Sequence, residues 1–331
     1  MIQKPPKVST GWDKSFILQI FMVLPIVLVC IPASFTRQEE FSEHPLPKPT
    51  DLLPALLFTA LLSVLRLIFA DRVFLKIAPY MVYRKPDWND HYTQFRYERF
   101  GITFFKFIYF AFVTPLGVFL FRKEDWLPHA LHGVGKGDMM MIYENFPYVP
   151  EVKYLTLYYC IELSYHLHSL IFHVCSTPRN DYYESLMHHV MTIFLIIFSY
   201  INMCGRLGVC VMILHDIVDA IMYFTKCVND CKNQIPASIG FILLATSYPR
   251  YRLYILARYI IPIGYRAREV IPDGATSGYI CYYLLVGMLC SLFFLHIYWY
   301  KLIIEMIFKF VGKKGVVDPH GTKQKPKELE N

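Results

Sequence analysis

The stretch ESLMHHVMTIFLIIFSY, residues 184–200, places two adjacent histidines at the start of a run that is otherwise almost wholly apolar. A second apolar run, CVMILHDIVDAIMYF at residues 210–224, follows closely and contains one histidine and two aspartates. Apolar runs near 20 residues are long enough to cross about 30 Å of hydrocarbon as helices. The two runs together predict a membrane-embedded helical hairpin that carries ionisable side chains.

The same apolar pattern recurs along the whole chain of 331 residues, which is 55% hydrophobic and only 18% charged. Lipid-spanning segments of this kind satisfy their backbone as helices. The sequence therefore predicts an all-α polytopic membrane protein with about eight transmembrane helices (seven or eight). The predicted spans are residues 15–35, 52–71, 102–121, 154–175, 185–203, 207–227, 237–263 and 279–310. The seventh is expected to kink or divide at Pro249.

The basic residues between these spans predict the orientation of the chain. The segments that share a side with both termini contain 17 Lys and Arg residues, and the segments on the other side contain 9. Because cytosolic loops carry the excess of positive charge, both termini are expected in the cytosol. The net charge of +7 then reflects topology. A nucleic-acid partner is not expected, since no basic stretch is interleaved with exposed aromatic residues.

Two histidines and two aspartates are expected to meet in the cytosolic half of the bundle. His188 and His189 lie one turn inside the predicted fifth span, and Asp216 and Asp219 lie on one arc of the sixth. The turn between these spans is short and centred near Gly205, so antiparallel packing brings the first histidine within one turn of the second aspartate in depth. An aspartate that fixes one ring nitrogen leaves the other available as a base or nucleophile.

A second set of polar side chains is interpreted as the lining of a substrate cavity. Glu162, His166 and His173 form a stripe on the predicted fourth span, with spacings of four and seven residues. His215 precedes the aspartates on the sixth span. Ionisable side chains inside a membrane are functional hypotheses by default. Hydrogen-bonded core histidines and a structural ion pair are the alternatives.

Two kinds of chemistry fit histidines and carboxylates in a membrane. Di-iron lipid oxidases and fatty-acid elongases require an HxxHH box, but Ser185 stands three residues before His188. The metal hypothesis therefore lacks ligands, and no metal is expected. Acyl transfer remains, in which an imidazole deprotonates a nucleophile or itself attacks a thioester.

The segment from Glu162 through the double histidine to the His-Asp-x-x-Asp box resembles the Lag1 motif of ceramide synthases, within the TRAM–Lag1–CLN8 (TLC) domain. Arg206 after the short turn fits the motif. His296 and Trp299 in FFLHIYWYK fit the last span of the family. The resemblance covers roughly residues 51–312, and the arginine and tryptophan join the expected cavity lining.

The resemblance implies a six-helix TLC-type bundle that encloses a lipid cavity and follows two N-terminal spans. It implies transfer of a fatty acyl group from acyl-CoA to the amine of a sphingoid base, sphinganine or sphingosine, to give ceramide or dihydroceramide in the endoplasmic reticulum membrane. No cofactor is implied besides acyl-CoA as co-substrate. The essential residues of the family carry over onto His188, His189, Asp216 and Asp219. The first histidine is favoured as the acylated nucleophile and the second as the acid/base.

Four regions are expected along the chain. Residues 1–50 form an N-terminal cytosolic segment, the first span and a luminal loop. Residues 51–97 hold the second span and a short linker, without the homeobox-like insert of many animal members. Residues 98–312 form the TLC/Lag1 catalytic domain, and residues 313–331 a disordered cytosolic tail.

Several kinds of binding partner are expected besides the sphingoid base. Arg179, Lys226 and Lys232 are candidates for the acyl-CoA headgroup, although charges that merely set topology would look the same. Membrane lipids are expected partners, and a homodimer or an accessory subunit stays open. A non-enzymatic TLC-domain protein that binds, transports or senses lipids is the alternative function.

Overall fold

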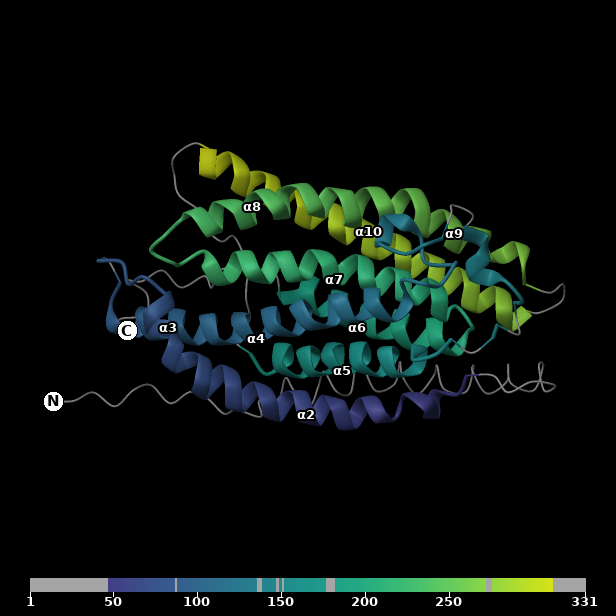
Figure 1. The fold of residues 1–331 in the computed structure, drawn as a ribbon, viewed down its shortest axis with the longest axis horizontal. Coiled ribbons are helices and arrows are strands. Elements are labelled where there is room, and N and C mark those ends of the chain that lie inside the picture. The colour runs from purple at the N-terminus through teal and green to yellow at the C-terminus, as the bar shows by residue number, and fades with distance from the viewer. Residues whose placement is uncertain are drawn as a thin grey trace.

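The computed structural model describes most of the chain as a bundle of long helices (Figure 1). The residues that it describes are 47–86, 88–135, 139–146, 149–150, 152–176, 182–271 and 276–311. Within them there is no β-strand, and only Pro128 and Gly135 form an isolated bridge. The predicted all-α class is confirmed. The predicted first span, 15–35, and the tail, 313–331, lie outside the described residues.

Seven helical rods make up the described part of the bundle. The uninterrupted helices are α2 (Pro54–Ile68), α4 (Asp90–Phe121), α5 (Leu155–Val174), α6 (Tyr182–Ile201), α7 (Gly205–Val228), α8 (Ile235–Tyr248) and α10 (Thr276–Val311). Two of them are extended: α2 through η2 (Phe69–Phe74) into α3 (Leu75–Met81), and α8 through η5 (Pro249–Ile260) into α9 (Ile261–Arg266). Short 3₁₀ turns are η1 (Pro49–Leu52), η3 (His129–Leu131), η4 (Met139–Tyr143) and η6 (Ala267–Glu269).

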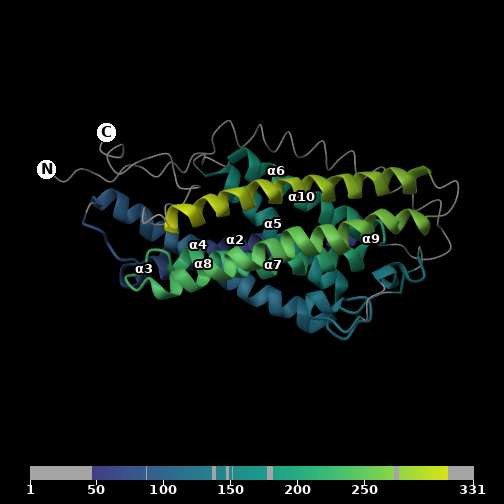
Figure 2. The same ribbon diagram turned by 90° about the horizontal axis from the view of Figure 1, so that it is seen from above.

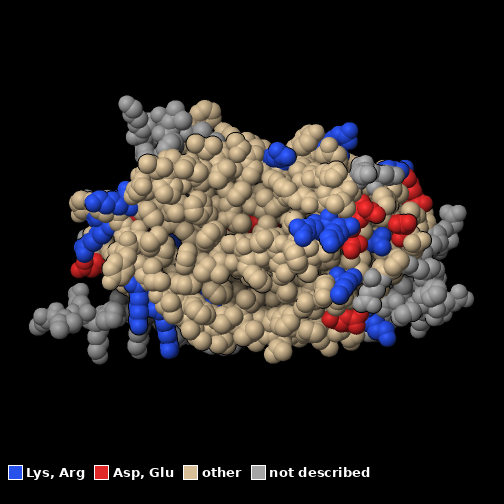
Figure 3. All heavy atoms as spheres, in the orientation of Figure 1, with Lys and Arg blue, Asp and Glu red and all other residues tan. Residues whose placement is uncertain are grey.

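Several of these rods are long and apolar enough to cross a membrane. The five that qualify by length and hydropathy are Pro49–Met81, Asp90–Phe121, Tyr182–Ile201, Gly205–Val228 and Gly278–Met306. Figure 3 shows that the middle of one face of the molecule is largely free of charge, while charged side chains gather toward the two ends. The protein is therefore a polytopic membrane protein. The number of eight spans stays a prediction.

The segment predicted to connect the second and third spans is mostly helical. The first rod continues to Met81, and α4 already begins at Asp90, where the side chain of Asn89 accepts a hydrogen bond from the backbone N–H of Tyr92 at 2.7 Å. Hydropathy detects only the apolar part of such a helix, so the predicted spans 52–71 and 102–121 are shorter than the helices that contain them. Arg72, Lys76, Arg96 and Arg99 are carried on helical extensions of two spans, while Arg84 and Lys85 lie in the short connection between them.

The predicted tight turn between α6 and α7 is confirmed. Met203 adopts a left-handed conformation with φ of 61°, and the backbone N–H of Cys204 donates to the carbonyl oxygen of Ser199 at 2.9 Å. One turn into α7, a Cβ atom at Gly208 would lie only 1.8 Å from the hydroxyl oxygen of Tyr159. The absence of a side chain at this glycine lets α5 approach the start of the hairpin closely.

Helix α7 lies at the centre of the bundle. It packs against α4, α5, α6, α8 and η5, while α10 packs against α6, η5 and α9 (Figures 1 and 2). The polar side chains of α7 are therefore surrounded by protein instead of lipid. The tightly packed centre also explains how a helix with two aspartates is tolerated at membrane depth.

The rod formed by α8, η5 and α9 is continuous, so the division predicted at Pro249 is absent. From that proline the backbone takes up a π-helical geometry that lasts for 12 residues. Proline removes one backbone N–H and crowds the preceding turn, and a wider turn relieves this conflict. Along η5 the side chain of Arg252 points into the bundle, whereas those of Arg250 and Arg258 are exposed.

Candidate active site

Two cavities adjoin inside the bundle and share three lining residues, His166, His188 and Asp219. We name them the apolar chamber, which runs from His188 to Leu292 and Tyr282, and the polar chamber, which runs from His188 to Arg96 and Asp230. All the described lining residues come from the six rods between α4 and α10 or from the segments that join them. The predicted cavity inside the bundle is thus present, with His188 where its two parts meet.

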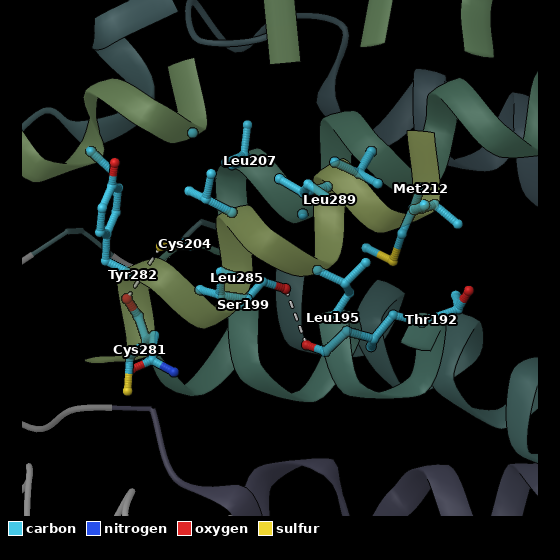
Figure 4. Close-up of a pocket in the computed structure, with 18 of the residues that line it drawn as sticks. Thr192, Leu195, Ser199, Cys204, Leu207, Met212, Cys281, Tyr282, Leu285 and Leu289 are labelled. Atoms are coloured by element: carbon cyan, nitrogen blue, oxygen red, sulfur yellow. Dashed lines mark hydrogen bonds between the residues drawn. The ribbon is translucent and has the colours of Figure 1, made fainter. Parts of the chain in front are cut away.

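The apolar chamber extends from His188 toward the turn between α6 and α7. The residues labelled in Figure 4 come from α6, α7 and α10 and from the turn before α7. They combine leucines and a methionine with small hydroxyl and thiol side chains and one tyrosine. Along α6 the lining runs from His188 to Asn202, which at 1.5 Å per residue is about 21 Å. One leaflet of a bilayer contributes about 15 Å of hydrocarbon. The apolar chamber is therefore deep enough for a long, extended acyl chain.

The polar chamber extends from His188 in the opposite direction, toward the turn between α7 and α8. Its ionisable lining residues are Arg96, Arg99, Lys106, His166, His173, His188, His189, Asp219, Lys226, Asp230 and Arg252. Arg96 and Asp230 form an ion pair across the chamber wall. This end of the bundle is the one predicted to face the cytosol.

His188 and His189 occupy different surroundings. The His188 ring lies at the junction of the chambers, edge-on to Trp299 with centroids 5.2 Å apart, while the His189 ring lies 5.5 Å from that of His173. Neither Nδ1 atom has a hydrogen-bond partner among the described residues, although both atoms are buried. Ring nitrogens that the protein does not satisfy are available to a bound substrate. The two rings therefore face different neighbours.

Asp219 pairs with an arginine and not with a histidine. Its Oδ1 atom lies 2.7 Å from Nη2 of Arg252, and the same Nη2 donates to the backbone carbonyl of His215 at 3.1 Å. The side chains of Arg252 and Asp219 are only 4% and 15% exposed. The prediction that this aspartate fixes a ring of the double histidine is wrong, because a buried carboxylate is better compensated by a permanent cation. It still shares both chambers with His188.

Asp216 also has a partner that the sequence did not indicate. Its Oδ2 atom accepts a hydrogen bond from the Tyr158 hydroxyl at 3.2 Å, and no described contact joins it to His188 or His189. Glu162 lines the apolar chamber with it, and both carboxylate oxygens of this glutamate are buried without a hydrogen bond among the described residues. The pair offers acceptors on the wall of the apolar chamber beside the junction.

A chain of hydrogen bonds links α7, α10 and α8. His215 Nε2 lies 2.8 Å from His296 Nε2, and His296 Nδ1 lies 3.2 Å from the hydroxyl of Tyr248. His215 Nδ1 lies 2.7 Å from the carbonyl oxygen of Val211, which can only accept. One arrangement of protons satisfies every link: His215 donates to that carbonyl, His296 donates to His215, and the tyrosine donates to His296. These hydrogen bonds fix the orientation of the His296 ring, which contacts the Trp299 ring.

The remaining predicted site residues divide between the chambers and the outside. His173 and Trp299 line the polar chamber, and Nε2 of this histidine lies 3.0 Å from the carbonyl oxygen of Tyr182. Lys226 lines the polar chamber as expected. His215 lines the apolar chamber, as Glu162 and His166 do.

Two of the predicted residues lie elsewhere, and one lies outside the described residues. Arg206 lines neither chamber, because its Nη1 atom donates to the carbonyl oxygen of Met141 at 3.2 Å and ties a connecting segment to α7. Lys232 is exposed beyond the polar chamber. Arg179 lies outside the described residues.

Sequence reasoning missed several residues of the site. Arg252 carried a signal, since an arginine inside a predicted span marks a functional position by default. Lys106 carried the same signal within the third predicted span. Tyr158 and Tyr248 carried none, because the chain has 25 tyrosines and most of them stand in similar apolar surroundings.

The described part of the chain contains no group of three or more His, Cys, Asp or Glu side chains that could hold a metal ion. His215 and His296 bind each other directly through their ring nitrogens. A reaction without a metal or cofactor stays a prediction. The groups on hand are imidazoles, carboxylates and cations around a junction between an apolar and a charged space, which suits acyl transfer between a lipid and a charged carrier.

Comparison with known proteins agrees with this geometry. The family model described as the TLC domain matches residues 99–305, which include the junction of the chambers. Ceramide synthase LOH1 of Arabidopsis thaliana is 27% identical over 286 residues, which cover 83% of this chain and 91% of the relative. The Alternaria stem canker resistance protein 1 of Solanum lycopersicum is 27% identical over 284 residues, with the same two shares. Ceramide synthase 5 of Homo sapiens is 26% identical over 259 residues, 72% of this chain and 62% of the human protein.

Proposed function

This chain belongs to the TLC domain family, and we propose that it is a ceramide synthase that transfers a fatty acyl group from acyl-CoA to the amine of a sphingoid base. The observation that carries the proposal is the position of His188, at the junction of an apolar and a cationic chamber. A fatty acyl-CoA has the same division, with a hydrocarbon chain on one side of its thioester and a charged carrier on the other. The names of the relatives support the reaction.

The two chambers suggest how the substrate lies. The acyl chain fills the apolar chamber, the thioester carbonyl stands at His188, and the CoA moiety extends through the polar chamber. Exclusion of bulk water from the apolar chamber limits hydrolysis of the thioester. The sphingoid base reaches the junction with its ammonium near Asp219, whose carboxylate is also held by Arg252.

In the first step a ring nitrogen of His188 attacks the thioester carbonyl. A C–N bond forms, the C–S bond breaks, and the imidazole proton leaves with the CoA thiolate, so that free CoA and an acyl-imidazole result. In the second step His189 accepts a proton from the substrate ammonium. The neutral amine then attacks the acyl group, the amide bond forms, the acyl–imidazole bond breaks, and the amine proton returns to the ring of His188.

The same proposal places the protein in the endoplasmic reticulum membrane with both termini in the cytosol. The excess of Lys and Arg on one set of connecting segments supports the cytosolic side of the termini, and the similarity to ceramide synthases supports the choice of membrane. The polar chamber then opens on the side where acyl-CoA is made available. A tag accessibility experiment on permeabilised cells tests this orientation independently of activity.

The reaction is tested by intact-mass measurement on the purified protein. With a long-chain acyl-CoA and no base, the protein is expected to gain the mass of one acyl group, and His188→Asn is expected to gain none. His168→Asn is the matched control, since His168 is buried, bonds to Ser63 at 3.0 Å and lines neither chamber. Subsequent addition of sphinganine is expected to remove the adduct and yield the amide.

The outcomes separate mechanism from function. If amide forms without an adduct, and His188→Asn forms no amide, the proposed ceramide synthase activity stands. His188 would then act as a general base and not as the nucleophile. No amide from any long-chain acyl-CoA and sphingoid base would refute the proposed function. A lipid-binding TLC-domain protein would then be the better description.

A further inference from the structure

Acyl transfer at the junction of the chambers places negative charge on the acyl carbonyl oxygen. When a nitrogen attacks a thioester or an acyl-imidazole, the carbonyl carbon becomes tetrahedral and its oxygen becomes an oxyanion. Enzymes stabilise that oxygen with a hydrogen-bond donor fixed beside it, and loss of one such donor slows the reaction about 100- to 1000-fold. The acyl carbonyl stands at His188 under the proposed function, so its donor must lie there too.

Three residues line both chambers and therefore adjoin this point: His166, His188 and Asp219. His188 is the proposed nucleophile. Asp219 offers only carboxylate oxygens, which accept hydrogen bonds and repel an oxyanion. His166 is the remaining member of the set, and a neutral imidazole carries one N–H donor.

Further donors near the junction line one chamber only. Arg252 lines the polar chamber, and its Nη2 atom is already engaged in the ion pair with Asp219. Trp299 lines the polar chamber as well. His215 lines the apolar chamber, and both of its ring nitrogens have partners. Apart from the nucleophile, His166 is thus the donor among the described residues that reaches both chambers.

The His166 ring is packed by the fold but is not hydrogen-bonded at its buried nitrogen. Its Nδ1 atom is buried and has no hydrogen-bond partner among the described residues, while its ring lies edge-on to that of Tyr165 with centroids 5.6 Å apart. The other two histidines of α5, His168 and His173, each have a partner at 3.0 Å. A buried imidazole that the protein leaves unsatisfied has a cost that an apolar ring would not have, and a hydrogen bond to a substrate offsets it.

We infer that His166 is a third catalytic histidine, which donates a hydrogen bond from its ring N–H to the acyl carbonyl oxygen in both steps of the transfer. The N–H proton stays on His166, because the oxyanion returns to a carbonyl when the leaving group departs. The proton transfers stay with His188 and His189. The role of His166 rests on the proposed function for the presence of an acyl carbonyl at the junction.

The role is tested by steady-state kinetics of amide formation from palmitoyl-CoA and sphinganine. His166→Phe keeps an aromatic ring beside Tyr165 but has no N–H. It should lower kcat about 100- to 1000-fold and change KM for acyl-CoA by less than about threefold, since the lost bond is strongest in the transition state. His166→Asn and His166→Gln place an amide N–H near the positions of Nδ1 and Nε2. One of these two variants should keep kcat within about tenfold of the wild type.

The matched control is the same substitution two residues further along the helix. His168 is buried on α5 and lines neither chamber, so His168→Phe should change kcat of the folded protein by less than about threefold.

Infrared difference spectroscopy tests the hydrogen bond itself. In the absence of a base the acyl group is expected to stay on His188, where an isotope-labelled carbonyl gives a separate stretching band. A hydrogen bond to the carbonyl oxygen lowers its stretching frequency. The band should therefore move to higher frequency in His166→Phe and stay in place in His168→Phe. A His166 ring that only packs would leave the band unchanged.

The outcomes separate the role of His166 from the proposed function. If His166→Phe forms amide at the wild-type rate, His166 is not catalytic and the proposed function stands. If both amide variants fold and still lose kcat by more than about 100-fold, the hydrogen-bond donor is refuted whether or not His166→Phe folds. A pH–rate profile that loses one limb in these variants would then make His166 an acid or a base. If the wild type forms no amide from any long-chain acyl-CoA, the proposed function fails and the role of His166 fails with it.

Discussion

Replacing Arg252 by methionine is expected to destabilise the bundle strongly, because it removes a buried positive charge. The guanidinium is the described partner of the Asp219 carboxylate at 2.7 Å, and the two side chains are 4% and 15% exposed. Methionine leaves that carboxylate among buried groups without a compensating cation. Removal of one member of a buried ion pair typically costs about 3–5 kcal/mol.

The structure also predicts that the two single substitutions, Arg252→Met and Asp219→Leu, destabilise the protein to different extents. Arg252 donates a second hydrogen bond, to the carbonyl oxygen of His215 at 3.1 Å, which Asp219→Leu leaves intact. Arg252→Met is therefore expected to cost about 1 kcal/mol more than Asp219→Leu. The double variant removes both charges and should recover most of the loss, because a buried ion pair exchanged for apolar side chains is often neutral in stability. The two single losses then add up to more than the double variant loses, and the coupling free energy is at least about 3 kcal/mol.

The assay is unfolding in mixed micelles with increasing SDS, followed by far-UV circular dichroism. Arg258→Met is the control, since Arg258 is an exposed arginine on the same rod, and it should change stability by less than about 0.5 kcal/mol. If Arg252→Met matches this control, or if the double variant is as unstable as the worse single variant, the ion pair does not compensate a buried charge and the argument fails.

Two further substitutions test the packing and the apolar chamber. Gly208→Ala is expected to lower the free energy of unfolding by about 1–3 kcal/mol, because the new Cβ would lie 1.8 Å from the Tyr159 hydroxyl. The control is Gly287→Ala, whose new Cβ would have no atom within 4 Å, and it should be neutral or stabilising in the same unfolding assay. Leu289→Trp narrows the apolar chamber and, under the proposed function, should lower transfer from palmitoyl-CoA relative to octanoyl-CoA by at least about tenfold. The lipid-exposed Phe294→Trp should leave that ratio unchanged, and an unchanged ratio in Leu289→Trp would place the acyl chain elsewhere.

The central hairpin could be predicted because its information is local. A short turn fixes two neighbouring helices as antiparallel, and equal distances from the turn then place residues at equal depth. This argument predicted that His188 and Asp219 lie at about the same depth, and the structure places both at the junction of the chambers. The depth was correct, while the partner was not, because depth within one hairpin does not reveal what the rest of the bundle brings to the same place.

Arg252 shows why the partner was hidden. It lies 33 residues beyond Asp219 in the sequence, on a rod whose geometry becomes π-helical at Pro249. A π-helix changes the angle between successive side chains, so α-helical periodicity does not predict which arginine of this rod faces inward. Arg250 and Arg258 look equivalent to it in the sequence and are exposed in the structure. Only the packing of three rods distinguishes them.

The division of labour between two adjacent histidines follows from the same packing. Neighbours on a helix differ by about 100° in direction, so only one of them can face the point where the chambers meet. His188 lines both chambers, whereas His189 lines the polar chamber only and contacts His173. Under the proposed function, the nucleophile must reach a carbonyl whose chain lies in one chamber and whose carrier lies in the other, and of the two histidines only His188 lines both chambers. The geometry thus supports acylation of His188 and leaves His189 beside the space through which the amine loses its proton.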